Sequence, residues 1–219
     1  MYLIANIIVC VCALVGFVCG ETQFFRPKKA LYAQMITLSL GCIAFGRLYN
    51  IIRLMTGGTI TDSFQLGFLG MIGSLMFFFS SNFGTVDSLV DDRSKEFKKY
   101  RLIAFAAPVA AVLLYAGLIL FGEVSPLWKL QGAVLTLFVI PASYFNLKHL
   151  IFPDVDFGVV KCLRKYNLLA LVYEVSIFFE CYAMSHDNEL ITLICCCVTG
   201  LITALIMPTV VRGVKKWTT

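Results

Sequence analysis

The sequence predicts an all-α fold: a polytopic membrane protein whose seven transmembrane helices form one bundle over a single domain, residues 1–219. The first observation is composition, because 59% of the residues are hydrophobic and only 14% are charged. Soluble domains have about 45–50% apolar and about 25% charged residues. The second is the presence of seven long apolar segments, and the third is a strong bias in where Lys and Arg occur. A chain of this kind requires the lipid bilayer as its surroundings.

The seven apolar segments define the expected spans. A helix needs about 20 residues to cross about 30 Å of hydrocarbon, and each segment is close to that length. The segments are too long and too uniformly apolar for barrel strands, and lipid leaves no partner for free backbone groups, so helices are expected. Residues 1–9 carry no Lys or Arg, which a signal peptide would have, so the first segment is interpreted as a retained span. The expected spans are 2–19, 31–52, 64–83, 102–121, 130–150, 167–185 and 190–211.

Basic residues predict the orientation. All but three of the 18 Lys and Arg residues fall in the first, third and fifth loops or after the last span, the exceptions being Arg47, Arg53 and Lys129. Cytoplasmic loops are the ones rich in Lys and Arg, so we expect a cell-membrane protein with its N-terminus outside and its C-terminus in the cytoplasm. The net charge of +5 is explained by this bias, and no soluble domain or aromatic-basic patch predicts nucleic-acid binding.

The longest charged connection covers residues 84–101. We expect it to be a solvated cytoplasmic turn, and the alternative is a docking surface for a cytoplasmic protein partner.

The spans also suggest an internal repeat. A shift of the chain that places Arg47 on Glu180 lays the first three spans on the last three in the same orientation, with the fourth span as a linker. Matching lengths and directions, rather than residue identities, support this 3+1+3 parallel plan.

Three charged residues lie inside expected spans: Arg47, Glu174 and Glu180. Each costs roughly 2.5–3.5 kcal/mol on insertion scales unless it is paired or hydrated. Arg47 and Glu180 fall at similar depth in the outer half of the bilayer, so a buried ion pair between them is expected, with Glu174 as the second candidate partner. Glu174 and Glu180 are six residues apart and point about 120° from each other, so they are not expected to share one small site. The pair is either part of a binding site or a static clamp between helices.

Polar residues cluster at both ends of the expected bundle. Near the outer side, Tyr49, Asn50 and Tyr182 can line an outward-facing polar cavity around Arg47. Arg53, Gln65 and Gln131 could line the same cavity, and the favoured alternative is that they are ordinary residues at headgroup level. Near the inner side lie Asn82, Tyr144, Asn146 and His149, together with Ser80, Ser81 and Ser143. We expect His149 to be an interfacial residue beside Lys148, and a proton carrier is the alternative.

Small residues and prolines predict local features of the helices. Gly67, Gly70 and Gly73 recur every three residues and predict close helix packing. Pro108, Pro141 and Pro208 lie inside spans and can kink them. The run Cys195–Cys197 cannot converge on one metal ion, because successive helical side chains point about 100° apart. No cofactor, metal site or catalytic residue is predicted.

The chain length, the seven spans and the 3+1+3 plan resemble the broad group that contains the PQ-loop and SWEET-type sugar transporters. The resemblance is architectural, since no Pro-Gln dipeptide occurs, the first span has no proline and the last span has no asparagine. It implies a small-molecule transporter with a polar site between spans two, three, five and six. Arg47 would be the anchor for the ligand or ion pair, and Glu174 the coupling carboxylate.

Two alternatives remain open. The first is a ligand-sensing receptor module that acts through residues 84–101. The second is an intramembrane lipid-modifying enzyme, in which Glu174, Glu180 and His149 are the only plausible acid-base groups.

Overall fold

The structure is a computed structural model that describes residues 1–25, 30–61, 66–83, 85–153 and 159–218. Within these ranges every regular element is a helix and no strand is present. Seven helical segments are long and apolar enough to cross a membrane, so the chain is an integral membrane protein with a seven-helix bundle. The elements are α1 (Tyr2–Gly20), η1 (Glu21–Phe25), α2 (Leu31–Met55), α3 (Leu66–Asn82), α4 (Thr85–Val90), α5 (Lys98–Ala104), α6 (Ala106–Leu114), η2 (Tyr115–Leu120), α7 (Pro126–Ile151), α8 (Val159–Ser185) and α9 (Glu189–Thr218).

The helices extend further than the apolar segments that predicted them. α7 begins four residues before the expected 130 because Ser125 caps it, with its side chain accepting from the backbone N–H of Trp128, and Pro126 follows at the first helical position. α9 continues to Thr218, past the expected 211, as a helix can continue beyond the hydrocarbon. The expected start of the third span, residues 64 and 65, lies outside the described residues.

The fourth span is made of three consecutive pieces, α5, α6 and the π-helix η2. The α-helix is interrupted at Phe105, three residues before Pro108. A proline at this position has no N–H to donate to the carbonyl of Ala104, and this loss accounts for the break. Pro141 and Pro208 lie inside α7 and α9, which continue as single helices.

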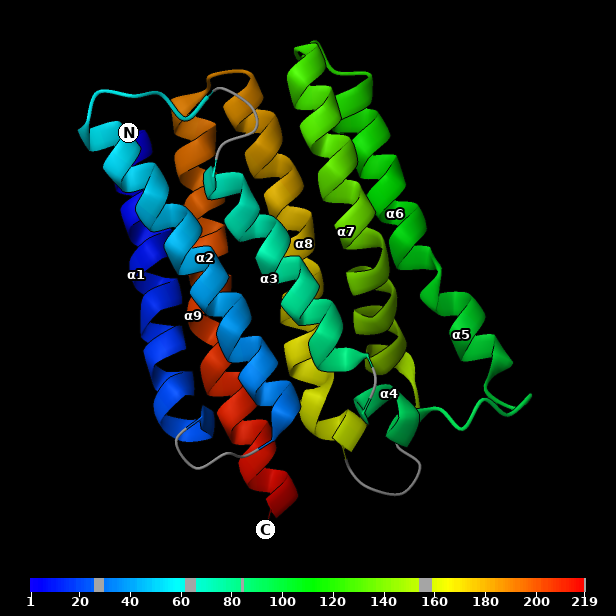
Figure 1. Cartoon of the computed structure of the whole chain (residues 1–219). Coiled ribbons are helices and arrows are strands. Elements are labelled where there is room, and N and C mark those ends of the chain that lie inside the picture. The colour runs from blue at the N-terminus through cyan, green and yellow to red at the C-terminus, as the bar shows by residue number, and fades with distance from the viewer. Residues whose placement is uncertain (26–29, 62–65, 84, 154–158, 219) are drawn as a thin grey trace.

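Six spans form a closed ring, and the fourth lies outside it. Around the ring, α1 packs on α2, α2 on α3, α3 on α7, α7 on α8, α8 on α9, and α9 returns to α1. α5 and α6 pack on α7 at the edge of the molecule, the right-hand side of Figure 1. Val109, Leu113 and other large apolar residues of this fourth span are exposed, as suits a surface in contact with lipid.

The order of neighbours around the ring is the one that a parallel repeat would produce. Exchanging the triplet α1–α2–α3 with the triplet α7–α8–α9 maps every one of the six contacts onto another of the six. The fourth span, on the periphery, is then the linker. The common origin of the two triplets stays a prediction.

Glycines allow α2 and α3 to approach closely. A Cβ on Gly46 would lie 2.8 Å from the carbonyl oxygen of Gly67 and 3.0 Å from the Cα of Gly70, and one on Gly70 would lie 2.6 Å from the carbonyl oxygen of Cys42. The obstructing atoms are backbone atoms, which cannot rotate away. The expected close packing through Gly67 and Gly70 is therefore confirmed. On the facing helix α2, Gly46 is the residue that contacts both of them.

The bundle has two ends, the Trp128 end and the Lys148 end, and each name is that of a residue buried there. The Trp128 end holds the N-terminus and the turns 56–61, 121–125 and 186–188, and is at the top of Figure 1. The Lys148 end holds α4, the start of α5 and the C-terminal end of α9. Trp128 is 5% exposed, and its indole Nε1 donates to the carbonyl of Thr61 at 2.9 Å, so it anchors the 56–61 turn over that end.

Candidate functional site

A buried ion pair joins α2 to α8. Nη1 of Arg47 lies 2.5 Å from Oε1 of Glu180, and the two side chains are only 5% and 1% exposed. Glu174, the other candidate partner, does not contact Arg47 but bonds elsewhere. The expected pairing of Arg47 with Glu180 is therefore confirmed. The prediction needed only that the two residues lie at similar depth on two helices that run in the same direction.

Four polar groups from three helices, α1, α2 and α9, surround this pair. The amide oxygen of Asn6, on α1, accepts from Arg47 Nη1 at 3.3 Å and from Asn50 Nδ2 at 3.1 Å. The hydroxyl of Thr199, on α9, donates to Glu180 Oε2 at 3.5 Å. The Sγ of Cys196 lies 3.9 Å from Arg47 Nη1. A low-dielectric interior tolerates charges only when hydrogen bonds satisfy them, and these groups supply part of that satisfaction.

Asn6 was missed by the sequence-based selection of site residues. It is fully buried and links α1 to both polar residues of α2. The signal was present, because Asn6 is the only amide and the only strongly polar side chain between residues 2 and 19. An amide in the middle of hydrocarbon requires a partner for the same physical reason as a charge.

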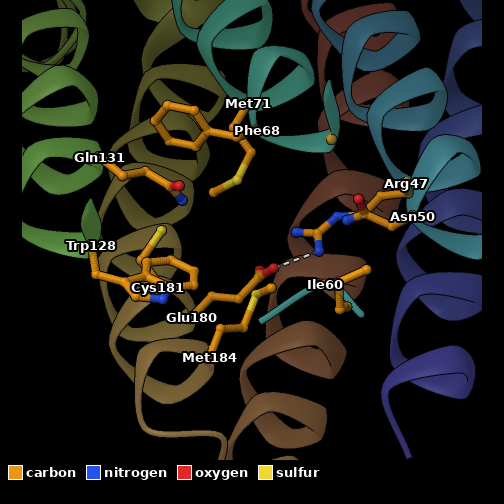
Figure 2. Close-up of a pocket in the computed structure, with 11 residues that line it drawn as sticks. Arg47, Asn50, Ile60, Phe68, Met71, Trp128, Gln131, Glu180, Cys181 and Met184 are labelled. Atoms are coloured by element: carbon orange, nitrogen blue, oxygen red, sulfur yellow. Dashed lines mark ion pairs between the residues drawn. The ribbon is translucent and has the colours of Figure 1, made fainter. Parts of the chain in front are cut away.

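A small cavity of about 30 Å³ lies beside the ion pair, between α2, α3, α7 and α8. These four helices are the second, third, fifth and sixth spans between which a polar site was expected. Figure 2 shows Arg47 and Asn50 on one side and Trp128, Gln131 and Cys181 on the other, with Glu180 reaching toward Arg47. The volume has room for about two water molecules. Its lining is Arg47, Asn50, Ile60, Gly67, Phe68, Met71, Trp128, Gln131, Glu180, Cys181 and Met184.

Other residues expected around this cavity lie beside it. Tyr49 is half-buried on α2 and Tyr182 half-buried on α8, and neither is among the lining residues. The ring of Tyr182 packs instead against the ring of His186, with centroids 4.3 Å apart and the ring planes tilted by 48°. Arg53 is half-buried near the end of α2. Gln65 lies outside the described residues. Gln131 is 5% exposed and lines the cavity, so its favoured placement at headgroup level is wrong and the cavity-lining alternative holds.

A second polar network begins at Glu174 and extends to the Lys148 end. Asn146 donates to Glu174 Oε1 at 2.6 Å and accepts from Asn82 Nδ2 at 2.6 Å. The oxygen of Asn82 lies 2.9 Å from His149 Nδ1, and His149 Nε2 lies 3.1 Å from Asp87 Oδ1. The network thus brings together three of the four residues expected in an inner polar cluster: Asn82, Asn146 and His149. Glu174 lies at the mid-membrane end of this network.

The expected interfacial position of His149 is wrong. Its side chain is 1% exposed and is held between Asn82 and Asp87. The sequence placed it one residue from the end of an expected span, but α4 folds back under the bundle and covers that end. Tyr144 lies to the side of the network, half-buried, with its ring 4.8 Å from that of Phe105.

Residues 84–101 are also not simply a solvated turn. The Lys148 ammonium lies 2.6 Å from Asp87 Oδ1 and 2.7 Å from Asp91 Oδ2, and Arg101 Nη1 lies 2.7 Å from Asp91 Oδ1. Asp91 and Lys148 are 3% and 4% exposed as side chains. The expectation of full solvation is therefore wrong for the acidic half of the segment. Lys95, Lys98 and Lys99 are exposed as expected.

An apolar layer separates the two polar networks. It is built from Leu75 on α3, Leu135 and Val139 on α7, and Ile177 on α8, none of which is more than 1% exposed. At this level a polar contact joins α3 to α8, where the hydroxyls of Ser74 and Tyr173 lie 2.9 Å apart. The centre of the bundle is thus closed between the Arg47–Glu180 pair and the Glu174 network.

The described residues contain no group of three or more His, Cys, Asp or Glu side chains placed to hold a metal ion. Cys195 is half-buried, Cys196 buried and Cys197 exposed, so the three thiols face different surroundings. Comparison with models of protein families, with curated proteins and with solved structures finds no match to this chain.

Proposed function

We propose that the protein is a small-molecule transporter whose solute site is the cavity between α2, α3, α7 and α8. The observation that carries the proposal is the position of this cavity: it lies on the buried Arg47–Glu180 pair, toward one end of a bundle whose centre is closed by apolar residues. Alternating access requires a site between helices that can open to one side while the other side stays sealed. At about 30 Å³ the cavity corresponds to a closed state that must widen to admit a solute.

Arg47 is the proposed anchor of the solute. Its guanidinium has five N–H donors, of which Glu180 and Asn6 take only part, and a planar acceptor such as a carboxylate or phosphate matches that geometry. An anionic solute would compete with Glu180 for Arg47. Opening of the pair would then be the event that joins binding to helix movement, since α2 and α8 belong to opposite triplets of the ring.

Glu174 is the proposed coupling carboxylate. It is 2% exposed, it lies one apolar layer from the cavity, and in the described chain Asn146 is the partner of one oxygen while Oε2 has none. A buried carboxylate without a cation is costly, and taking up a proton relieves that cost. A change of its protonation would act on α7 through Asn146 and thereby on the network that reaches Asp87.

The test is solute-driven proton movement in proteoliposomes loaded with a pH-sensitive dye. Panels of carboxylates, phosphate esters, amino acids and sugars are added outside, and one class is expected to move protons. Arg47→Gln should abolish both binding and flux, while Glu174→Gln should retain binding, measured by thermal shift, and lose coupling. Proton-coupled flux that is unchanged in Glu174→Gln would exclude the coupling role.

The receptor alternative has one observation in its favour. The polar network connects Glu174 to Asp87, on α4, and Lys148 ties α4 and Asp91 to α7, so a change inside the bundle can reach residues 84–101. A receptor would move no solute of any class. It would retain a cytoplasmic protein that is released by charge reversal of the exposed Lys98 and Lys99.

A further inference from the structure

A second cavity lies on the lipid-facing side of the ring, between the peripheral helix α6 and helices α7 and α8. Its volume is about 80 Å³, and it is separate from the cavity at Arg47, with which it shares no lining residue. Three alanines of α6, Ala107, Ala110 and Ala111, form one wall, and their small side chains create the space. The remaining lining is Leu114, Val139, Ser143, Leu171, Glu174, Val175 and Phe178.

The entrance of this cavity faces lipid. Ala110 on α6 is exposed, and Val175 on α8 is 43% exposed, so the cavity opens between these two helices at the surface of the bundle. Both residues lie inside apolar spans. A molecule would therefore enter from the hydrocarbon, and it must carry an apolar body.

The polar groups of the cavity are acceptors once the Glu174 carboxyl has given up its proton. Of its lining residues, only Ser143 and Glu174 have polar side chains. Glu174 Oε2 is buried with no hydrogen-bond partner in the described part of the chain. The Ser143 hydroxyl uses its proton on the carbonyl of Ile140 at 3.1 Å, which leaves the lone pairs of its oxygen free to accept. A matching head group must donate more than one hydrogen bond and complement a carboxylate.

We propose that this cavity binds a lipophilic primary amine, with its ammonium group on Glu174 and Ser143 and its alkyl chain directed out between α6 and α8 toward lipid. An ammonium offers three donors and the charge that the carboxylate lacks, whereas an anionic or carbonyl head group offers neither. The amine enters neutral from the bilayer and takes the proton of the Glu174 carboxyl, which leaves an ammonium–carboxylate pair and no net change of charge. Binding at this position does not depend on the proposed transport, and it would place the amine in competition with the proton at Glu174.

The test uses the full-length protein in lipid nanodiscs and dicyclohexylcarbodiimide, a hydrophobic reagent that adds to protonated carboxyls in apolar surroundings. Mass spectrometry of the peptide that contains Glu174 measures the fraction that stays unmodified, because an amine can also capture the activated carboxyl as an amide, and such capture is not protection. Dodecylamine is expected to protect Glu174 in a concentration-dependent manner, and dodecanol, which has the same chain and no cation, is expected not to. Equal protection by dodecanol, or absence of protection by dodecylamine, would overturn the proposal.

Two variants on α6 test the cavity without replacing Glu174. The result therefore does not depend on whether a Glu174 variant folds. Ala110→Leu fills the entrance and should raise the half-protective concentration of dodecylamine by at least about 10-fold, a loss of roughly 1.4 kcal/mol in binding. Ala106→Leu adds the same side chain at an exposed position of the same helix outside the cavity lining, and should leave protection unchanged. Equal effects of the two variants would show that protection does not arise in this cavity. Because the readout is occupancy at Glu174, a protein that moves no solute can still give the expected result.

Discussion

Arg47 on α2 and Glu180 on α8 meet at 2.5 Å in the interior of the bundle, although 133 positions separate them in the chain. They are also the two residues that the internal shift superposes. Residues at equivalent positions of two repeats related by a two-fold axis along the membrane normal meet when they lie near that axis. In the predicted 3+1+3 plan, the ion pair would therefore lie near the axis that relates the two triplets.

Removing one member of this pair should destabilise the protein strongly. Glu180→Gln leaves a buried guanidinium with Asn6 and Cys196 as its neighbours, and breaking a buried pair in this way costs about 3–5 kcal/mol. The double variant Arg47→Met/Glu180→Leu removes both charges and should recover most of the loss. Unfolding by SDS titration in mixed micelles measures both, with Lys99→Met, at an exposed position, as the control.

The double variant also separates a binding role from a static clamp. If the pair only clamps α2 to α8, a stable double variant keeps its activity. If Arg47 anchors the solute, the double variant is stable and has lost solute binding. A double variant as unstable as Glu180→Gln would contradict the description of the pair as a replaceable buried ion pair.

The contact between α2 and α3 should be intolerant of a single methyl group. In Gly46→Ala the new Cβ would meet backbone atoms of Gly67 and Gly70 at 2.8 and 3.0 Å, so the helices must separate. Overpacking of this kind costs about 1–3 kcal/mol. Gly117→Ala is the matched control, since a Cβ there has no neighbour within 4 Å. Thermal unfolding in detergent should show a lower Tm for Gly46→Ala and no decrease for Gly117→Ala, and equal Tm values would mean that the helices are not in close contact.

The two histidines should respond differently to replacement. His149→Ala leaves Asn82 Oδ1 without a partner in a buried network and leaves Asp87 with Lys148 alone, which costs about 1–3 kcal/mol. His186 is exposed in the turn between α8 and α9, and His186→Ala should change the free energy of unfolding by less than about 0.5 kcal/mol. SDS-titration unfolding compares the two. Similar small effects would indicate that the polar network contributes little to stability.

The number and order of the spans could be predicted from the sequence because hydrophobicity and charge act over whole segments. The Arg47–Glu180 contact could be predicted because two intramembrane charges of opposite sign at similar depth have few other partners. Asn6 could have been included by the same rule applied to amides. In each of these cases the cost of an unsatisfied polar group in hydrocarbon is what makes the inference possible.

The covering of the Lys148 end could not be predicted in this way. Lys148 and His149 lie in the last turn of an expected span and are followed by a loop, which is the pattern of interfacial residues. Their burial depends on where α4 folds, and that in turn depends on the pairing of Asp87 and Asp91 with Lys148. A short polar segment carries no periodic signal for such a fold. The alanine-lined cavity at Glu174 was equally hidden, since it depends on which face of α6 packs on α7.

The orientation of the bundle is the last prediction, and it follows from the basic residues. Reporter proteins fused after Lys95 and after Asp187 should lie on opposite sides of the membrane, because α5, α6, α7 and α8 make three crossings between them. Green fluorescent protein should fluoresce only in the Lys95 fusion, and alkaline phosphatase, which folds outside the cytoplasm, should be active only in the Asp187 fusion. Reversed activities would place the N-terminus in the cytoplasm and the Arg47 cavity nearer the cytoplasmic face. The network from Glu174 to Asp87 would then face outward, and residues 84–101 could not serve as a cytoplasmic docking surface.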